Sequence, residues 1–267
     1  MAETSKALDV AESRRPGGAG SSRLPKPTAA ECPPELNEGE MTLMEHLIEL
    51  RDRIMKAVIG VAIGTVIGFI FARQVFELLI RPLPEQAEVV ALGPTDSIFM
   101  YFKVALVLGV IISMPVILYQ IVQFILPGLY PNERRYLYWL LPSGTIAFAS
   151  GAVFAALVVI PFSIRYLSGF MADIISPTYQ VQRYIDFVTT LMFWVGLVFE
   201  TPLLIYFLSK LGVVDHKKLA SGRRYAVVIL AVVAAIVTPT PDPVTMMVVM
   251  TPMVLLYELG VQLARLA

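Results

Sequence analysis

FVTTLMFWVGLVFETPLLIYFL, residues 187–208, is an apolar run with the length and composition of a membrane-spanning helix, and it contains one charged side chain, Glu200. A carboxylate at such a depth costs on the order of 2.5–3.5 kcal/mol unless a partner or a water-filled cavity receives it. Glu200 therefore indicates a binding or coupling surface within the bilayer. Alternatively, it is a structural residue that is protonated or bonded to Gln120, Gln123 or a threonine hydroxyl.

The composition of the whole chain is that of a membrane protein. Of its 267 residues, 57% are hydrophobic and 16% are charged, which is more apolar surface than one water-soluble globular domain can cover. The 21 basic and 21 acidic residues balance, so bulk charge does not favour nucleic acid as a partner. The single cysteine, Cys32, lies in a polar segment, so neither a disulfide framework nor a thiolate metal cluster is expected.

Two parts are expected along the chain. Residues 1–40 are rich in Pro, Gly, Ser and charge and hold no apolar signal-peptide core, which predicts a disordered cytoplasmic tail. Residues 41–267 form the transmembrane domain. It opens with an amphipathic helix, MTLMEHLIELRDRIMKA (41–57), and Thr42 with Glu45 has the spacing of a capping box. We expect this helix to lie near the membrane surface before the chain turns into the first span.

The fold class predicted is all-α, a polytopic bundle of six transmembrane helices. Only helices and closed barrels can cross lipid, and these apolar runs are too long for barrel strands and lack their alternation. The six predicted spans are Ala57–Ala72, Ile98–Leu126, Tyr136–Phe162, Phe187–Leu208, Tyr225–Thr238 and Val244–Leu263.

The lysines and arginines between the spans predict the orientation. With the N-terminus inside, the inner segments hold sixteen of them and the outer segments hold four. Because positive charge accumulates on the cytoplasmic side of membrane proteins, both termini are predicted to be cytoplasmic.

Prolines and one short run predict irregular spans. Pro115 and Pro202 each remove an intrahelical hydrogen bond, so each is expected to kink its span. Tyr225–Thr238, with about 1.5 Å of rise per residue, is about 21 Å long and cannot cross a bilayer core of about 30 Å unless the membrane thins or neighbours shield it. Asp242 followed by Pro243 predicts the start of the last helix.

Two further carboxylates lie at the predicted inner border of the membrane. Glu49 lies beside Arg51 in HLIELRDR, and Glu133 precedes Arg134 and Arg135 in PGLYPNERR. Both carboxylates are interpreted either as solvated residues in local ion pairs, or as groups that converge on one face and receive a cationic ligand. Arginine would suit that second role, because its planar fork meets a carboxylate with two hydrogen bonds.

No enzyme activity, catalytic residue, metal or cofactor is predicted. The predicted spans contain no histidine to activate a nucleophile and no phosphate-binding glycine loop, and His46 and His216 have no partners at ligand spacing. Gly60, Gly64 and Gly68 are better interpreted as a helix-packing face. An alternative function is a proton-coupled secondary transporter that uses Glu200, although the chain lacks the internal repeat typical of that class.

Three motifs resemble the TatC family, the polytopic receptor subunit of the twin-arginine protein translocase. They are HLIELRDRI (46–54), SMPVILYQIVQFILPGLYPNERR (113–135) and VGLVFETPLLI (195–205). The resemblance covers residues 41–263 and departs from the family pattern in the long N-terminal tail, in the residue before Glu133 and in the turn TPTPDP.

The resemblance implies a receptor for signal peptides with consecutive arginines, which moves folded proteins with the proton-motive force. It implies a concave, glove-like bundle in the plasma membrane of a prokaryote, or an equivalent energised membrane. The implied partners are twin-arginine signal peptides, single-span translocase subunits, membrane lipid and further copies of the chain in a larger complex. The positions matched to signal-peptide binding are Glu49, Arg51, Phe124, Glu133, Arg134 and Arg135. Glu200, with Gln120 as a nearby polar group, matches the partner contact, and Pro115, Pro202 and Asp242 are structural.

Overall fold

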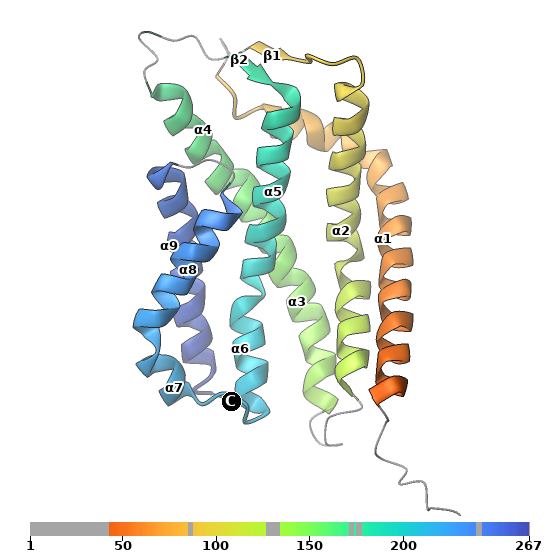
Figure 1. Cartoon of the computed structure of the whole chain (residues 1–267), viewed down its shortest axis with the longest axis vertical. Coiled ribbons are helices and arrows are strands. Elements are labelled where there is room, and N and C mark those ends of the chain that lie inside the picture. Colours follow the sequence, from red (N-terminus) through yellow and green to blue (C-terminus); the bar gives the residue numbers. More distant parts are fainter. Residues whose placement is uncertain are drawn as a thin grey trace, which may run out of the picture. The chain divides into compact units, whose positions relative to one another are not determined.

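The computed structural model describes residues 43–84, 88–126, 134–170, 174, 178–238 and 242–266. The predictions made for residues 1–42 lie outside this part of the chain. Residues 43–267 form one compact unit that is almost entirely helical (Figure 1). Its helices are α1 (Leu43–Ile80), α2 (Asp96–Ile125), α3 (Arg134–Phe154), α4 (Ile160–Gly169), α5 (Val181–Phe199), α6 (Thr201–Lys210), α7 (His216–Ser221), α8 (Arg223–Val237) and α9 (Pro243–Leu263).

Five helical segments of the described residues are long and apolar enough to cross a membrane. They are Met44–Ile80, Asp96–Ile125, Tyr138–Gly169, Val181–Lys210 and Pro243–Leu263. The remaining predicted span corresponds to α8, whose 15 residues extend about 22 Å at about 1.5 Å each. The prediction that this helix is short is confirmed, whereas six membrane crossings and cytoplasmic termini stay predictions.

The start of the domain differs from the prediction. The prediction of a surface helix that turns into a separate span at Ala57 is wrong, because α1 runs without interruption through 38 residues. The physical reason is local: no proline or turn residue interrupts the sequence between Leu43 and Gly60, so the backbone hydrogen bonds continue into the apolar run. Leu47 and Ile54, part of the amphipathic stripe, are more than half exposed.

Small residues bring α1 and α2 together. A side chain at Gly64 would overlap the Ser113 hydroxyl and would place its Cβ 2.5 Å from the carbonyl oxygen of Gly109. One turn earlier, the Ser113 hydroxyl donates a hydrogen bond of 2.8 Å to the carbonyl of Gly60. The glycines predicted as a packing face therefore face α2, and the two backbones approach closely because no side chain separates them.

Two prolines coincide with irregular backbone in the long spans. The third span widens into a π-helical turn, η2 (Ala155–Val159), where the amide of Ile160 donates to the carbonyl of Ala155 just before Pro161. The fourth span divides into α5 and α6 next to Pro202, as predicted. In contrast, α2 continues as one helix through Pro115. A proline removes one backbone donor and crowds the carbonyl four residues earlier, which favours such local rearrangement without enforcing a break.

A small sheet at one end of the bundle was not predicted. Strands β1 (Glu88–Val90) and β2 (Thr178–Gln180) pair in parallel, with Val89 opposite Tyr179. They join the connection between α1 and α2 to the segment that enters α5 (Figure 1). Three-residue strands are too short to show an alternating pattern, and this pair is separated by 90 residues of sequence.

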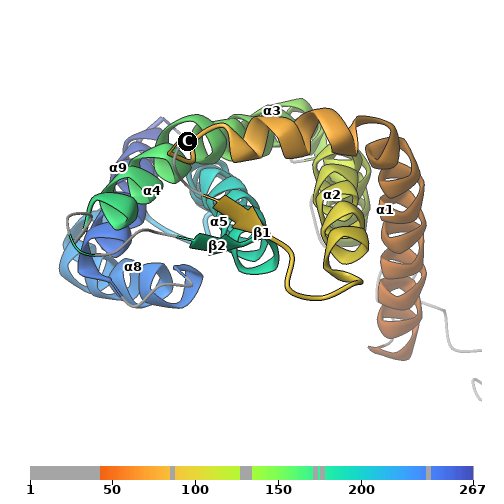
Figure 2. The same ribbon diagram turned by 90° about the horizontal axis from the view of Figure 1, so that it is seen from above.

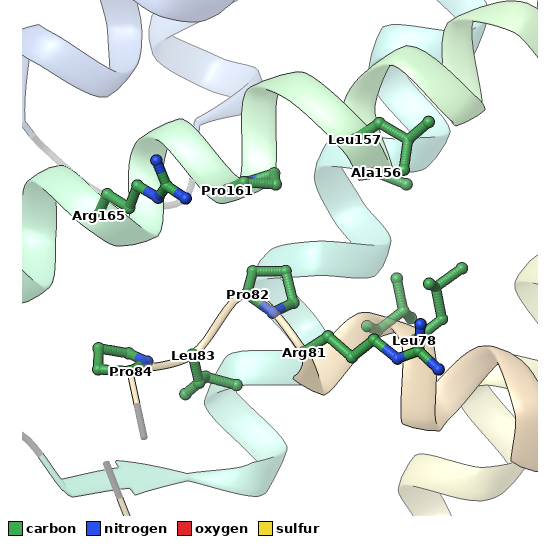
Figure 3. A pocket seen from close by; sticks show the side chains of 10 residues that line it. Leu78, Arg81, Pro82, Leu83, Pro84, Ala156, Leu157, Pro161 and Arg165 are labelled. Atoms are coloured by element: carbon green, nitrogen blue, oxygen red, sulfur yellow. The ribbon is translucent and has the colours of Figure 1, made fainter. Parts of the chain in front are cut away.

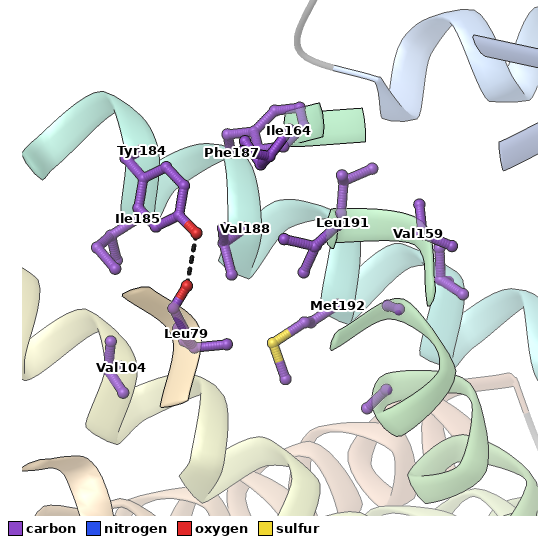
Figure 4. Close-up of a cluster of buried hydrophobic side chains, with 14 of the residues drawn as sticks. Leu79, Val104, Val159, Ile164, Tyr184, Ile185, Phe187, Val188, Leu191 and Met192 are labelled. Atoms are coloured by element: carbon purple, nitrogen blue, oxygen red, sulfur yellow. Dashed lines mark hydrogen bonds between the residues drawn. The ribbon is translucent and has the colours of Figure 1, made fainter. Parts of the chain in front are cut away.

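Helix α5 lies at the centre of the packing. Ten of its 19 residues are buried, whereas only Ala234 and Val237 are buried on α8. The Tyr184 hydroxyl donates a 2.5 Å hydrogen bond to the carbonyl of Leu79, one of the last carbonyls of α1 (Figure 4). Seen end-on, α1, α2, α3 with α4, and α9 follow a curve with α5 on its inner side, in agreement with the predicted concave bundle (Figure 2).

The α1–α2 contact can be tested with a matched pair of substitutions. Gly64→Ala should lower the thermal unfolding temperature in detergent, since overpacking at such a contact costs about 1–3 kcal/mol. Gly169→Ala, where an added Cβ would meet nothing within 4 Å, should leave it nearly unchanged. Equal unfolding temperatures for both variants would contradict the close approach.

Candidate functional site

A carboxylate with one unused oxygen lies near the start of α1. Arg53 donates to Oε1 of Glu49 from Nη2 at 3.1 Å and from Nε at 3.4 Å, and the two side chains are only 24% and 19% exposed. Oε2 of Glu49 is buried and has no hydrogen-bond partner among the described residues. The interpretation of Glu49 as part of a local ion pair is therefore correct for one oxygen, and the other oxygen remains able to accept.

An aromatic pair joins α1 to the end of α2 on the same side. The rings of His46 and Phe124 stack with their centroids 4.4 Å apart and an interplanar angle of 23°. His46 and Glu49 are three residues apart on α1, so they occupy neighbouring positions on one helix face. Phe124 is thereby held close to the face that carries the Glu49 carboxylate. We call His46, Glu49, Arg53 and Phe124 the α1–α2 end cluster.

The other residues that the family resemblance assigns to signal-peptide binding are not brought together in this way. Arg51 is exposed and pairs with the adjacent Asp52 at 2.8 Å, so the structure does not join it to Glu49. Glu133 lies outside the described residues. Arg134 and Arg135 form the first turn of α3, and their side chains lie outside the described part. The starts of α1 and α3 and the end of α2 all lie at one end of the bundle (Figure 1), so the convergence of Glu49 and Glu133 stays a prediction.

Glu200 stands at the junction between α5 and α6. Its amide donates to the carbonyl of Leu197, and its own carbonyl accepts from the amides of Leu203 and Leu204. Pro202 has no N–H to extend the α5 ladder, so the chain passes from one helix to the next at this residue. The residue is 5% exposed, which means that its side chain is held inside the bundle.

The surroundings of the Glu200 carboxyl group are largely apolar. A Cβ added at Gly144 of α3 would lie 3.1 Å from Oε2 of Glu200 and 2.7 Å from the side chain of Leu118 of α2. The absence of a side chain at Gly144 therefore makes room for the carboxyl group. Oε1 of Glu200 is buried without a hydrogen-bond partner in the described part of the chain.

Gln120, one of the alternative partners that the sequence offered for Glu200, forms no hydrogen bond with it among the described residues. Gln120 is buried on α2, and its own Oε1 also has no hydrogen-bond partner there. Two buried side-chain oxygens thus remain unused at the depth of the spans. Leaving a buried polar group without a partner costs about 1–3 kcal/mol, which favours an interaction with a group outside this chain.

A cavity of about 260 Å³ lies between α3 and α6, and its lining includes Ser143, which precedes Gly144, and Leu203, three residues after Glu200. It extends from this level toward the end of α6. Its lining residues are Trp139, Leu140, Ser143, Leu203, Tyr206, Phe207 and Lys210. Trp139 is 73% exposed, so this side of the bundle presents an aromatic surface next to a hollow.

The structural positions behave partly as predicted. Asp242 caps α9, because its carboxylate accepts a 2.7 Å hydrogen bond from the amide of Thr245 and Pro243 occupies the first turn.

Sequence reasoning missed the ion pair between Lys103 of α2 and Asp186 of α5. The sequence does place opposite charges near the outer ends of two predicted spans. These residues are 83 positions apart, so the sequence alone does not pair them. No group of three or more potential metal ligands occurs among the described residues.

Comparison with known proteins identifies close relatives over most of the chain. Residues 45–252 match the family model described as "Sec-independent protein translocase protein (TatC)". The Sec-independent protein translocase protein TatC of Aquifex aeolicus is 40% identical over 232 residues, which cover 85% of this chain and 96% of that protein. TatC of Carboxydothermus hydrogenoformans is 34% identical over 231 residues, covering 86% of this chain and 95% of that protein.

A solved structure is similar to the fold as well. The crystal structure of the twin-arginine translocase receptor TatC superposes with a TM-score of 0.74 at 40% sequence identity. The match covers 83% of this chain and 99% of that chain. The curved helical bundle described above is therefore the fold of that receptor.

The unused oxygen of Glu200 leads to a stability prediction. Glu200→Leu should raise the thermal unfolding temperature of the isolated protein in detergent, because it removes a buried polar group that makes no hydrogen bond. Asp242→Ala, which removes a helix cap, should lower it by the equivalent of about 0.5–2 kcal/mol. A lower unfolding temperature for Glu200→Leu would show that the carboxyl group has a stabilising partner within the chain.

Proposed function

Because this chain belongs to the TatC family, we propose that it is the receptor subunit of a twin-arginine translocase. In this proposal it binds signal peptides with paired arginines on the cytoplasmic face. Together with single-span partner subunits, it then exports folded proteins with the proton-motive force. The membrane is the plasma membrane of a prokaryote or an equivalent energised membrane.

The observation that carries the proposal is Oε2 of Glu49, which has no hydrogen-bond partner among the described residues. A carboxylate that is four-fifths buried and held by Arg53 has little rotamer freedom left to lose on binding a guest. A guanidinium that donates to Oε2 would complete its hydrogen bonding, and such a charge-assisted contact contributes about 1.5–3 kcal/mol. Glu133 is proposed to hold the second arginine of the pair, and Arg134, Arg135 and Arg51 to help select the segment around it.

In this proposal the stacked rings of His46 and Phe124 position the Glu49 carboxylate. The stack of Phe124 on His46 connects α2 to the face of α1 that carries Glu49. It thereby links the carboxylate to the loop that follows α2. Lysine is expected to replace a signal arginine poorly, because an ammonium group lacks the planar fork that meets a carboxylate at two atoms.

Orientation and subunit contacts complete the proposal. The excess of Lys and Arg, sixteen against four, supports a cytoplasmic position for the end cluster. In this topology α8 is a sixth, short crossing. A partner helix with a polar group is proposed to lie along the α3–α6 cavity and to supply the missing hydrogen bond to Glu200. The cavity is lined by Ser143, which precedes Gly144, and by Leu203, three residues after Glu200.

Peptide binding tests the receptor function. Glu49→Gln and Glu133→Gln should each weaken binding of a paired-arginine signal peptide roughly 10-fold to 150-fold in nanodiscs, because a charge-assisted contact becomes a neutral one. Both variants should also bind single-arginine peptides nearly as well as paired-arginine ones. Asp52→Asn removes the same charge from the exposed face of α1 and serves as the matched control. Wild-type affinity and wild-type selectivity in both glutamine variants would refute the proposal.

Subunit association tests the role of Glu200. Glu200→Leu should reduce co-purification of a single-span partner from membranes by about fivefold or more, because one hydrogen bond to a charged group at membrane depth is lost. Its signal-peptide affinity should stay unchanged, because Glu200 lies at the α5–α6 junction and is not one of the residues proposed to contact the signal peptide. Undiminished co-purification would exclude this contact.

A further inference from the structure

A second cavity lies at the opposite end of the bundle from the α1–α2 end cluster. It measures about 590 Å³, within the size range of sites for small ligands. One wall is the end of α1 with the residues that follow it, and the other is η2 with α4 (Figure 3). The lining residues are Leu78, Leu79, Arg81, Pro82, Leu83, Pro84, Ala156, Leu157, Pro161 and Arg165.

The cavity combines apolar walls with two positive charges. Arg81 comes from the α1 wall and Arg165 from the α4 wall (Figure 3). Among the described residues, the lining contains no carboxylate and neither arginine forms an ion pair. Two arginines beside a low-dielectric surface attract an anion, and each guanidinium can bind phosphate oxygens with two parallel hydrogen bonds.

The position along the spans indicates where that anion comes from. Arg81 directly follows the first span, Met44–Ile80, and Arg165 lies four residues before the end of the span Tyr138–Gly169. Both arginines are therefore at the level where a bilayer changes from hydrocarbon to headgroups. Leu78 and Leu157, which line the cavity below them, are 43% and 62% exposed. The apolar wall thus continues onto the surface that acyl chains cover.

We propose that this cavity binds an anionic phospholipid, with its phosphate attracted by the positive charges of Arg81 and Arg165 and an acyl chain along Leu78 and Leu157. A soluble phosphate would use the arginines but would leave the leucines without a partner. A zwitterionic lipid would place its ammonium group next to two guanidinium groups. The prolines at 82, 84 and 161 restrict the backbone of both walls, so little order is lost on binding.

Lipid titration of the full-length protein tests the site. The protein, purified in a neutral detergent, is titrated with phosphatidylglycerol or phosphatidylcholine, and bound lipid is counted by native mass spectrometry. Arg81→Gln and Arg165→Gln should each weaken phosphatidylglycerol binding about fivefold, and the double variant about thirtyfold. Phosphatidylcholine binding should be weaker and unchanged by the substitutions.

A control variant distinguishes binding in this cavity from non-specific attraction by the positive charges at this end of the bundle. Arg183→Gln removes the positive charge of an exposed residue in the first turn of α5, at the same end of the bundle but outside the cavity, and should keep wild-type phosphatidylglycerol affinity. An equal loss in Arg183→Gln and the cavity variants would overturn the proposal, as would no loss in the double variant. Displacement of the lipid by millimolar inorganic phosphate would assign the site to a soluble anion instead.

Cross-linking gives an independent position for the lipid. Phosphatidylglycerol with a photoreactive acyl chain should label residues within 78–84 and 156–165 in the wild-type protein in nanodiscs. The double arginine variant should lose this labelling while retaining the wild-type unfolding temperature. Labelling confined to other segments in the wild type would also overturn the proposal.

Discussion

A bilayer core offers no hydrogen bonds, so every polar atom in the spans must find its partner within the protein or in another protein. Several hydroxyl side chains of the described spans obey this rule. Thr65, Thr189 and Thr251 each donate to the carbonyl four residues earlier, and Tyr184 donates across the bundle to the end of α1. Side-chain oxygens of Gln120, Ser163, Thr245 and Glu200 are exceptions among the described residues. Of these four residues only Glu200 is ionisable, which supports the contact proposed for it.

The same constraint explains how the helices can be irregular. A proline breaks one backbone hydrogen bond, and the structure repairs or avoids the loss in two ways. At Pro161 the preceding turn widens, with the amide of Ile160 reaching back to Ala155. At Pro202 one helix ends and the next begins, and the junction carries Glu200. The polar side chain that a membrane tolerates least therefore lies where the backbone is already interrupted and buried among other helices.

The two ends of the bundle carry opposite chemistry. The α1–α2 end cluster offers a buried carboxylate oxygen to a positively charged guest. The cavity at the other end offers two guanidinium groups to a negatively charged one. Between them, the close contact of α1 and α2 through glycines and the central position of α5 hold both sites on rigid helices. Sites built on such elements keep their geometry better than sites on loops.

The sequence by itself determined the apolar spans, the small-residue face of α1, the break at Pro202 and the Asp242 cap. These features depend on hydropathy, steric size and hydrogen bonds that reach no more than four residues along the chain. Only the tertiary structure decided that Gly144 and Leu118 lie near the Glu200 carboxyl group, and that Tyr184 bonds to Leu79 across 105 residues. The reason is that these neighbours are selected by packing between helices, where the energy depends on which surfaces fit together and leaves no periodic pattern in the sequence of either partner.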